Sequence, residues 1–313
     1  MTFVHRLAEG CMPFLHMIQS IRTPIFDSIF SLITHLGEET FFLVIAIFFF
    51  WCVNKREGYF ILITGLVGTV VNQMAKIFFR IPRPWVLDSE FDIVESAREE
   101  ATGYSFPSGH TQNIAGTYGA ISAFRPKFWK TLICVTIISL VAFSRMYLGV
   151  HTPLDVVVSL VVAFALVLVL CPCFATEDSF KKSMPWIALC SVVLSTGFLM
   201  YVLMIGGDEG IDVANYNSAL KNACTLFGCT LAMIPVFIID SKLIKFETDA
   251  RWYAQILKLV LGLAGVLAIK TLLSEPLTAL FGNEYIARAV RYFLIVLFAG
   301  GIWPITFKWF KKM

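Results

Sequence analysis

Long apolar stretches follow one another along most of this chain. They lie at residues 38–53, 57–79, 108–123, 131–148, 152–172, 185–205, 218–239, 254–273 and 290–308. Most of them approach the roughly 20 residues that a helix needs to cross a bilayer. In lipid, backbone polar groups must be paired within their own segment, so such stretches predict helices. We therefore expect an all-α fold, a polytopic membrane bundle of about nine transmembrane helices.

The composition agrees with a membrane protein. The chain is 58% hydrophobic and 15% charged, whereas a soluble domain averages about 25% charged residues. The net charge of +3 is small and spread over many loops, which argues against a nucleic-acid partner. The eight cysteines lie mostly inside apolar stretches, as expected for buried thiols rather than for disulfides or a zinc site. No cleavable signal peptide is expected, because residues 1–11 lack an apolar core.

Residues 12–36 differ from the long apolar stretches. His16, Arg22 and Asp27 are interspersed there with apolar side chains, and Pro24 interrupts the pattern. This arrangement predicts a pair of amphipathic helices that lie in the membrane interface and are broken at the proline. A tilted additional span is the alternative.

The charges of the loops predict the orientation of the chain. One set of loops is basic and contains Lys55, Arg56, Arg125, Lys127, Lys130, Lys181, Lys182, Lys242, Lys245, Arg251, Lys308, Lys311 and Lys312. The opposite set is acidic and contains Asp88, Glu90, Asp92, Glu95, Glu99, Glu100, Asp208, Glu209 and Asp212. The basic loops should be cytoplasmic and the acidic loops extracytoplasmic or lumenal. The membrane would be the plasma membrane of a bacterium or the endoplasmic reticulum of a eukaryote.

Three groups of polar residues interrupt the apolar pattern on the acidic side. The first is Lys76 and Arg83-Pro84, separated by six residues; the second is Pro107-Ser108-Gly109-His110; the third is Ser144-Arg145 with His151 and Asp155. Ionisable residues inside a membrane are costly and usually functional. A phosphate dianion needs several converging donors, for which arginine and lysine are suited. The groups therefore predict a phosphate site that faces the acidic side.

The second group begins a predicted helix. Ser108 is a natural N-cap, and the unpaired N–H groups of the same helix start can bind an anion. Gly109 would let a phosphate approach the backbone closely. His110 is either a structural histidine or a general acid beside the leaving oxygen.

The third group leads into another predicted helix. Thr152 suits the N-cap, Pro153 the first turn and Asp155 the third position. Asp155 either completes a capping box or orients the His151 imidazole, whose other nitrogen would then act as a nucleophile or base. Ser144 either packs between helices or contacts the phosphate.

These motifs and their spacing resemble the type 2 phosphatidic acid phosphatase superfamily, which includes glucose-6-phosphatase and the sphingosine phosphate phosphatases. The resemblance covers roughly residues 38–172. It implies that His151 is the nucleophile and forms a phosphohistidine, that Asp155 orients it, and that His110 is the catalytic acid and then the base. It further implies phosphate binding by Lys76, Arg83, Ser108, Gly109 and Arg145, with no metal and no cofactor.

The resemblance predicts an integral, multi-pass phosphatase that hydrolyses a lipid phosphate monoester or diphosphate at the extracytoplasmic face. A lipid substrate is favoured because the motif helices open at the membrane surface. The alternatives are a lipid-linked phosphotransferase with the same site and a phosphatase of a soluble sugar phosphate. A transporter would not need the complete catalytic set. Loop 85–106 forms either a lid over the site or an ordinary solvated loop.

We expect three regions: an interfacial segment at 1–37, a catalytic core at 38–172 and a C-terminal helical extension at 173–313. The extension has no comparable group of ionisable residues. Its charged residues Lys221, Lys270, Glu275 and Arg291 lie near span ends and either anchor the helices at the interface or line a second cavity. A homodimer is possible.

Overall fold

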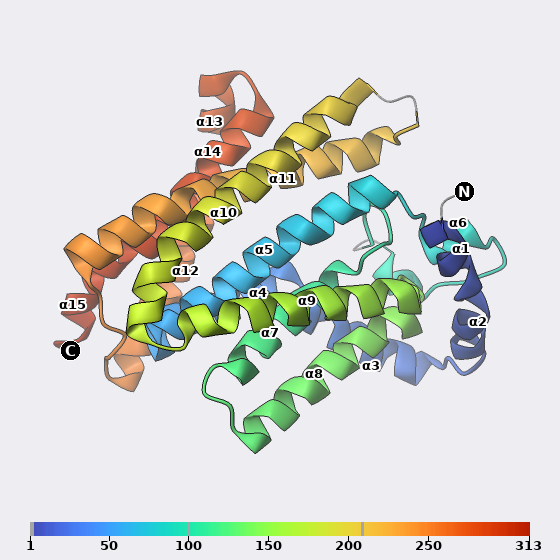
Figure 1. Ribbon diagram of the computed structural model, residues 1–313, viewed down its shortest axis with the longest axis horizontal. Coiled ribbons are helices and arrows are strands. Elements are labelled where there is room, and N and C mark those ends of the chain that lie inside the picture. Colours follow the sequence, from blue (N-terminus) through green and yellow to red (C-terminus); the bar gives the residue numbers. More distant parts are fainter. Residues whose placement is uncertain (1–2, 99–100, 208–209) are drawn as a thin grey trace. The chain divides into compact units, whose positions relative to one another are not determined.

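The computed structural model describes residues 3–98, 101–207 and 210–313, and this part of the chain consists of helices and loops without a strand (Figure 1). The predicted outer-loop acids Glu99, Glu100, Asp208 and Glu209 lie outside the described residues. Contacts divide the chain into two compact units. The first comprises Met1–Leu43, Ile63–Cys171 and Asp212–Asn215; the second comprises Val44–Leu62, Pro172–Ile211 and Tyr216–Met313. The predicted division at residues 37 and 172 stays a prediction.

Seven helical segments of the described part are long and apolar enough to cross a membrane. They are Lys55–Leu87, Phe128–Tyr147, Pro153–Phe174, Glu177–Met204, Val213–Ile244, Trp252–Leu272 and Glu284–Phe310. An eighth candidate is the pair Pro24–Gly37 and Glu39–Val53, which is bent by 51° at its break. The all-α, polytopic membrane fold is thus confirmed, with seven or eight qualifying spans among the described residues where about nine were expected.

The segment 108–123 accounts for one expected span that does not qualify. It forms helix α7 (Gly109–Ala123) of only 15 residues. At 1.5 Å per residue this helix is about 22 Å long, less than the roughly 30 Å of a hydrocarbon core. Its amino-terminal end reaches the site described below.

The chain begins with three short helices, α1 (Phe3–Gly10), α2 (Met12–Ser20) and α3 (Pro24–Thr34). The predicted break at Pro24 is present. Thr23 caps α3 by accepting a hydrogen bond from the Phe26 amide at 3.4 Å, and Pro24 occupies the first turn, where its missing N–H costs nothing. The short 3-10 turn η1 (His35–Gly37) and helix α4 (Glu39–Phe48) follow, and the π-helical turn η2 (Phe49–Val53) extends α4.

Polar residues attach this amino-terminal segment to the end of helix α8 (Phe128–Tyr147). Arg22 Nε donates to the Tyr147 carbonyl at 2.8 Å, and the Tyr147 hydroxyl donates to Asp27 Oδ1 at 2.9 Å. His16 Nε2 lies 2.8 Å from Asp88 Oδ2. The charges that make residues 12–36 amphipathic therefore attach the segment to the part of the chain that holds the motifs. Its position in the membrane interface stays a prediction.

Three longer elements complete the first unit. Helix α5 (Lys55–Phe79) runs into this unit and is followed by the short α6 (Pro84–Leu87), and α9 (Pro153–Phe174) begins in it. Helix α7 packs against α8, and η1 packs against α7. Gly37 permits this last contact, because a Cβ there would lie 2.9 Å from Val141 and 3.0 Å from the Cβ of His110. The amino-terminal segment thus lies against the histidine of the second motif.

The second unit is built mainly from α10 (Glu177–Met204), α11 (Val213–Ile238), α12 (Trp252–Leu272), α13 (Ser274–Phe281) and α14 (Glu284–Leu297). Its four long spans agree with the prediction. The separate helix α13 was not predicted. It ends at Gly282, whose φ of 63° is left-handed, and Asn283 caps α14 by accepting from the amides of Tyr285 and Ile286 at 2.9 and 3.1 Å.

Candidate active site

The three sequence motifs lie at helix ends within the first unit. Lys76 is in the last turn of α5, Arg83 precedes α6, and Ser108 is the N-cap of α7. Arg145 lies in the last turn of α8 and Asp155 in the first turn of α9. The fold brings the motifs together: Arg83 Nη1 lies 3.0 Å from His151 Nε2, and the Ser108 amide donates to the Asp155 carbonyl at 3.2 Å.

His151 and Asp155 form a buried pair. The Nδ1 atom of His151 lies 3.3 Å from Asp155 Oδ2, and both side chains are almost fully buried. The same carboxylate oxygen accepts a hydrogen bond from the Ser105 hydroxyl at 2.6 Å. A carboxylate can only accept hydrogen bonds, so the pair places the imidazole proton on Nδ1.

Asp155 also completes the predicted capping box. Its Oδ2 accepts from the Thr152 amide at 2.8 Å, while its own amide donates to Thr152 Oγ1 at 3.3 Å. These two reciprocal bonds satisfy orphan donors at the start of α9. The carboxylate therefore caps the helix and contacts His151 at the same time. The two interpretations that the sequence left open, a capping box and orientation of the imidazole, are thus compatible.

Arg83 is held at both sides of its guanidinium. Its Nε donates to the Gly103 carbonyl at 3.1 Å and its Nη2 to the Thr102 carbonyl at 2.7 Å. Its Nη1 donates to the Val150 carbonyl at 2.9 Å and lies 3.0 Å from His151 Nε2. Because arginine has no acceptor, His151 Nε2 must be the unprotonated nitrogen. Arg83 and Asp155 thus select the same tautomer from opposite sides of the ring.

Burial lowers the pKa of the His151 imidazole well below its usual value, and the neighbouring positive charges lower it further. The charged form is disfavoured in a buried, cationic environment. His151 is therefore neutral at neutral pH, with a lone pair on Nε2, as a nucleophile or base requires.

Lys76 contacts the end of the loop between α6 and α7. Its Nζ donates to the carbonyls of Tyr104 and Ser105 at 2.7 and 3.3 Å. The Ser105 amide donates to the Ile81 carbonyl at 2.8 Å. The last residues of loop 85–106 are therefore bound to two of the predicted phosphate cations, Lys76 and Arg83. A lid movement of this loop stays a prediction.

Arg145 and Ser144 have different surroundings at the end of α8. Arg145 is buried, and its Nη1 donates to the Thr34 hydroxyl at 2.5 Å. The Ser144 hydroxyl donates to the Val141 carbonyl of its own helix at 2.7 Å. This local bond fits the packing role that the sequence left open for Ser144.

The second motif presents a helix start to the same region. The Ser108 hydroxyl accepts from the Thr111 amide at 3.4 Å and from the Thr111 hydroxyl at 3.0 Å. At Gly109 an added Cβ would meet only Asn72 Oδ1, at the ordinary distance of 3.8 Å. Packing against the protein therefore does not require a glycine here, whereas close approach of a ligand to the backbone would.

Sequence reasoning missed three polar residues around the motifs. Ser105 binds Asp155 and Thr34 binds Arg145, as described above. Asn72 is buried, precedes Lys76 by one helical turn, and has no hydrogen-bond partner for either side-chain polar atom among the described residues. Asn72 could have been found from its spacing, because residues i and i+4 share a helix face. Ser105 and Thr34 carried no comparable signal.

The site has no arrangement typical of a metal centre. Within residues 3–98, 101–207 and 210–313, no three histidine, cysteine or acidic side chains gather where they could hold a metal ion. The donors around His151 are instead cationic and suited to an anion.

Comparison with known proteins agrees with these motifs. The profile of the PAP2 superfamily matches residues 56–179, and that of the PAP2 superfamily phosphatase, transmembrane extension, matches residues 221–313. The undecaprenyl-diphosphatase BcrC of Bacillus subtilis is 31% identical over 141 residues, which are 44% of this chain and 70% of that protein. Phosphatidylglycerophosphatase B of the same organism is 31% identical over 149 residues, 44% of this chain and 69% of that protein.

Other similarities are more partial. A probable sphingosine-1-phosphate phosphatase of Dictyostelium discoideum is 29% identical over 179 residues, 53% of this chain and 43% of that protein. The chain spans about half the length of the sphingosine-1-phosphate phosphatases that it matches. The crystal structure of Aquifex aeolicus LpxE aligns with a TM-score of 0.45 and 25% identity, over 50% of this chain and 92% of that one. With both profiles matched in order and relatives of 31% identity covered over two thirds of their length, the chain belongs to the PAP2 superfamily.

Proposed function

We propose that this protein is an integral membrane phosphatase that hydrolyses a lipid phosphate monoester or diphosphate through a phosphohistidine on His151. The observation that carries the proposal is the position of the imidazole. Its Nδ1 faces Asp155, and its Nε2 lies 3.0 Å from the Arg83 guanidinium. A phosphate held by Arg83 would therefore lie next to a neutral nitrogen, whose lone pair accepts a hydrogen bond from Arg83 Nη1 until the phosphate takes that bond over.

In the first step, His151 Nε2 attacks phosphorus. An N–P bond forms while the P–O bond to the leaving group breaks. Arg83 Nη1 transfers its hydrogen bond from Nε2 to a phosphate oxygen, which frees the lone pair. Asp155 stabilises the positive charge that develops on the ring, as the carboxylate does in a serine hydrolase triad. His110 gives its proton to the leaving oxygen.

In the second step, water attacks the phosphohistidine. His110, now neutral, accepts a proton from that water, the N–P bond breaks, and neutral His151 and inorganic phosphate are released. His110 is assigned this role by the resemblance and by its position in the first turn of α7, next to Ser108 and Gly109. Each histidine returns to its starting protonation state, so the cycle consumes only the substrate and one water molecule.

The phosphoryl oxygens would be held by Lys76, Arg83, Arg145, and the start of α7 at Ser108 and Gly109. Phosphoryl transfer depends mostly on positioning and on neutralising the equatorial oxygens, and these groups supply fixed positive charge and N–H donors. Asn72, beside Gly109, adds an amide whose buried polar atoms lack partners among the described residues. A buried polar group of this kind costs about 1–3 kcal/mol, which contact with substrate would offset.

The substrate class follows from the membrane setting and from the relatives. Proteins similar to this chain are named for sphingosine-1-phosphate and undecaprenyl diphosphate, and both compounds are lipid phosphates. The motif residues lie on the same predicted side of the membrane as the acidic loop residues Asp88 and Asp92. We therefore place catalysis at the extracytoplasmic or lumenal face. No step requires a metal ion.

A substrate panel on the purified protein in detergent, with a chelator present, tests this function. It should contain phosphatidate, sphingosine phosphate, polyprenyl mono- and diphosphates, and glucose 6-phosphate. We expect release of inorganic phosphate from at least one lipid. Preference for the soluble sugar phosphate would contradict the lipid assignment, and loss of all activity in chelator would contradict the metal-free mechanism. Addition of lipid alcohols as acceptors separates hydrolysis from phosphoryl transfer.

A further inference from the structure

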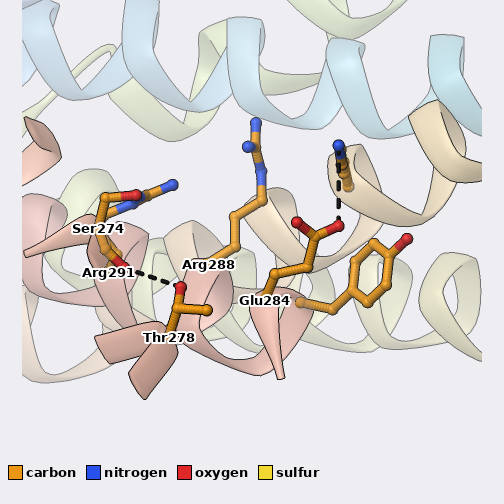
Figure 2. A pocket seen from close by; sticks show the side chains of 7 residues that line it. Ser274, Thr278, Glu284, Arg288 and Arg291 are labelled. Atoms are coloured by element: carbon orange, nitrogen blue, oxygen red, sulfur yellow. Dashed lines mark hydrogen bonds and ion pairs between the residues drawn. The ribbon is translucent and has the colours of Figure 1, made fainter. Parts of the chain in front are cut away.

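A second group of cations lies in the C-terminal unit and plays no part in the chemistry above. Lys221 of α11 and Arg288 and Arg291 of α14 line a cavity of ≈ 170 Å³. Ser274 and Thr278 of α13 contribute hydroxyl groups to its wall, and Glu284 contributes a carboxylate. In Figure 2, Arg288 and Glu284 extend from α14 beside one another, whereas Arg291 lies beside Ser274. The turn from α13 to α14 therefore borders a partly open polar cavity in a unit made largely of apolar helices.

The charges of this cavity do not balance. Lys221 Nζ lies 3.8 Å from Glu284 Oε1, and this is a loose pair of half-exposed side chains. In the part of the chain that the structure describes, neither Arg288 nor Arg291 forms an ion pair. The two arginines are three residues apart, which places them on one face of α14, where like charges repel. An anion between them would remove this repulsion.

Both arginines are held in place by neutral groups. Arg288 Nε donates to Thr225 Oγ1 of α11 at 2.7 Å. Arg291 Nη1 donates to the Ser274 hydroxyl, and Arg291 Nε is buried without an acceptor among the described residues. Arginines that only anchor a helix extend to water, but these two contact neighbouring helices instead. Fixed guanidiniums lose little entropy when they bind an oxyanion, which favours binding.

The geometry points to a second anion site, in which Arg288, Arg291 and Lys221 bind a phosphate group without hydrolysing it. A cavity of about 150 Å³ holds a six-carbon ring, so ≈ 170 Å³ accommodates a phosphate with part of its ester group. All five histidines of the chain precede residue 152, so this cavity has no histidine nucleophile. The ligand is a phosphate group, supplied by free phosphate or by a phospholipid headgroup. This site does not depend on the proposed function.

The experiment measures binding to the full-length protein in detergent. Inorganic phosphate is titrated by calorimetry, and bound phosphatidylglycerol molecules are counted by native mass spectrometry. Both are performed on the Arg83→Gln background, which weakens the first site. The variant is Arg288→Gln with Arg291→Gln, and Lys270→Gln is the matched control, because Lys270 is an exposed cation at the end of α12 and does not line the cavity.

We expect the double variant to bind at least one of the two probes about tenfold more weakly, and Lys270→Gln to bind like its parent. If the double variant loses inorganic phosphate binding, free phosphate is sufficient to occupy the site. If it loses only phosphatidylglycerol binding, the site recognises a phospholipid headgroup. Unchanged binding of both probes, or an equal loss in Lys270→Gln, would overturn the proposal. If the double variant does not fold, Glu284→Gln provides the test: removal of the lining carboxylate should tighten binding, and weaker binding would contradict the site.

Discussion

The motif cluster of the first unit and the cationic cavity of the second use the same kinds of phosphate-binding side chains, but only the first surrounds a histidine. Arg83 lies 3.0 Å from His151 Nε2, whereas the corresponding neighbours of Arg288 and Arg291 are the hydroxyls of Thr225 and Ser274. Under the two proposals, positive charge alone therefore provides binding. Reaction requires a neutral imidazole and a carboxylate that holds its tautomer, and these belong to the start of α9.

Removal of the nucleophile should convert the first site into one that binds without reacting. His151→Ala should reduce turnover to below about 1% of the wild-type rate, because the proposed phosphoenzyme forms on this imidazole. The measurement is phosphate release at saturating lipid substrate, together with a melting curve that establishes folding. His5→Ala, in α1, is the control and should retain activity. If His151→Ala kept more than a few per cent of the activity, His151 could not be the nucleophile.

Variants of Arg83 and Arg288 distinguish a guanidinium that takes part in catalysis from one that only binds an anion. Arg83→Gln should lower kcat about 100-fold, the usual cost of one preorganised donor to a developing charge. Arg288→Gln should leave kcat within about twofold, because the residues that line its cavity include none of the groups that react in the proposed mechanism. Arg80→Gln is the matched control close to the site: Arg80 follows α5, and its Nε donates to the Ile77 carbonyl of that helix at 3.2 Å. Equal losses in Arg83→Gln and Arg80→Gln would indicate a general structural effect.

Ser105 tests whether the orientation of the His151–Asp155 pair matters. Ser105→Ala removes the 2.6 Å hydrogen bond to Asp155 Oδ2, and a bond to a charged group contributes roughly 1.5–3 kcal/mol. We expect kcat to fall about tenfold with little change in KM. Ser105→Thr keeps the hydroxyl and should restore most of the rate. A loss that appears only in KM would mean that Ser105 contacts the substrate instead.

The pH dependence should show the smallest effect. His151 is active when neutral, and its pKa lies well below 6.5 because of burial and the nearby cations. The acid limb of kcat/KM should therefore lie below pH 6.5, and activity should be lost as the pH falls through the lowered pKa. Removal of one cation in Arg83→Gln should raise that pKa and move the limb to higher pH. A limb that stays in place in this variant would contradict the electrostatic assignment.

The local parts of the site could be predicted from the sequence. Thr152, Pro153 and Asp155 indicate the start of α9, and Ser108 indicates the start of α7, because capping depends on residues three positions apart. The spacing of the motifs also indicated which residues would meet. Helix α13 was missed, because residues 274–281 lie between the expected spans 254–273 and 290–308 and begin with Ser274, Glu275 and Pro276, which are typical of a loop.

The long-range parts could not be predicted. Thr34 reaches Arg145 across 111 residues of chain, and the carbonyls of Thr102 to Ser105 reach Lys76 and Arg83. A hydroxyl or a backbone carbonyl has no sequence pattern that names its partner. The cavity of α13 and α14 could be predicted only in part. The sequence left anchoring and a second cavity open for Lys221 and Arg291, and only the fold places them beside Arg288.

Trapping of the phosphoenzyme tests the central assignment most directly. His110→Ala retains the nucleophile but lacks the group that protonates the leaving oxygen and activates water. Reaction with a polyprenyl diphosphate labelled in its terminal phosphate, whose leaving phosphate needs little protonation, should therefore leave label on the protein. We predict one labelled site at His151, with the acid lability and alkali stability of a phosphohistidine, and no label in the His151→Ala, His110→Ala double variant. Label on another residue, or label that persists in the double variant, would contradict the mechanism.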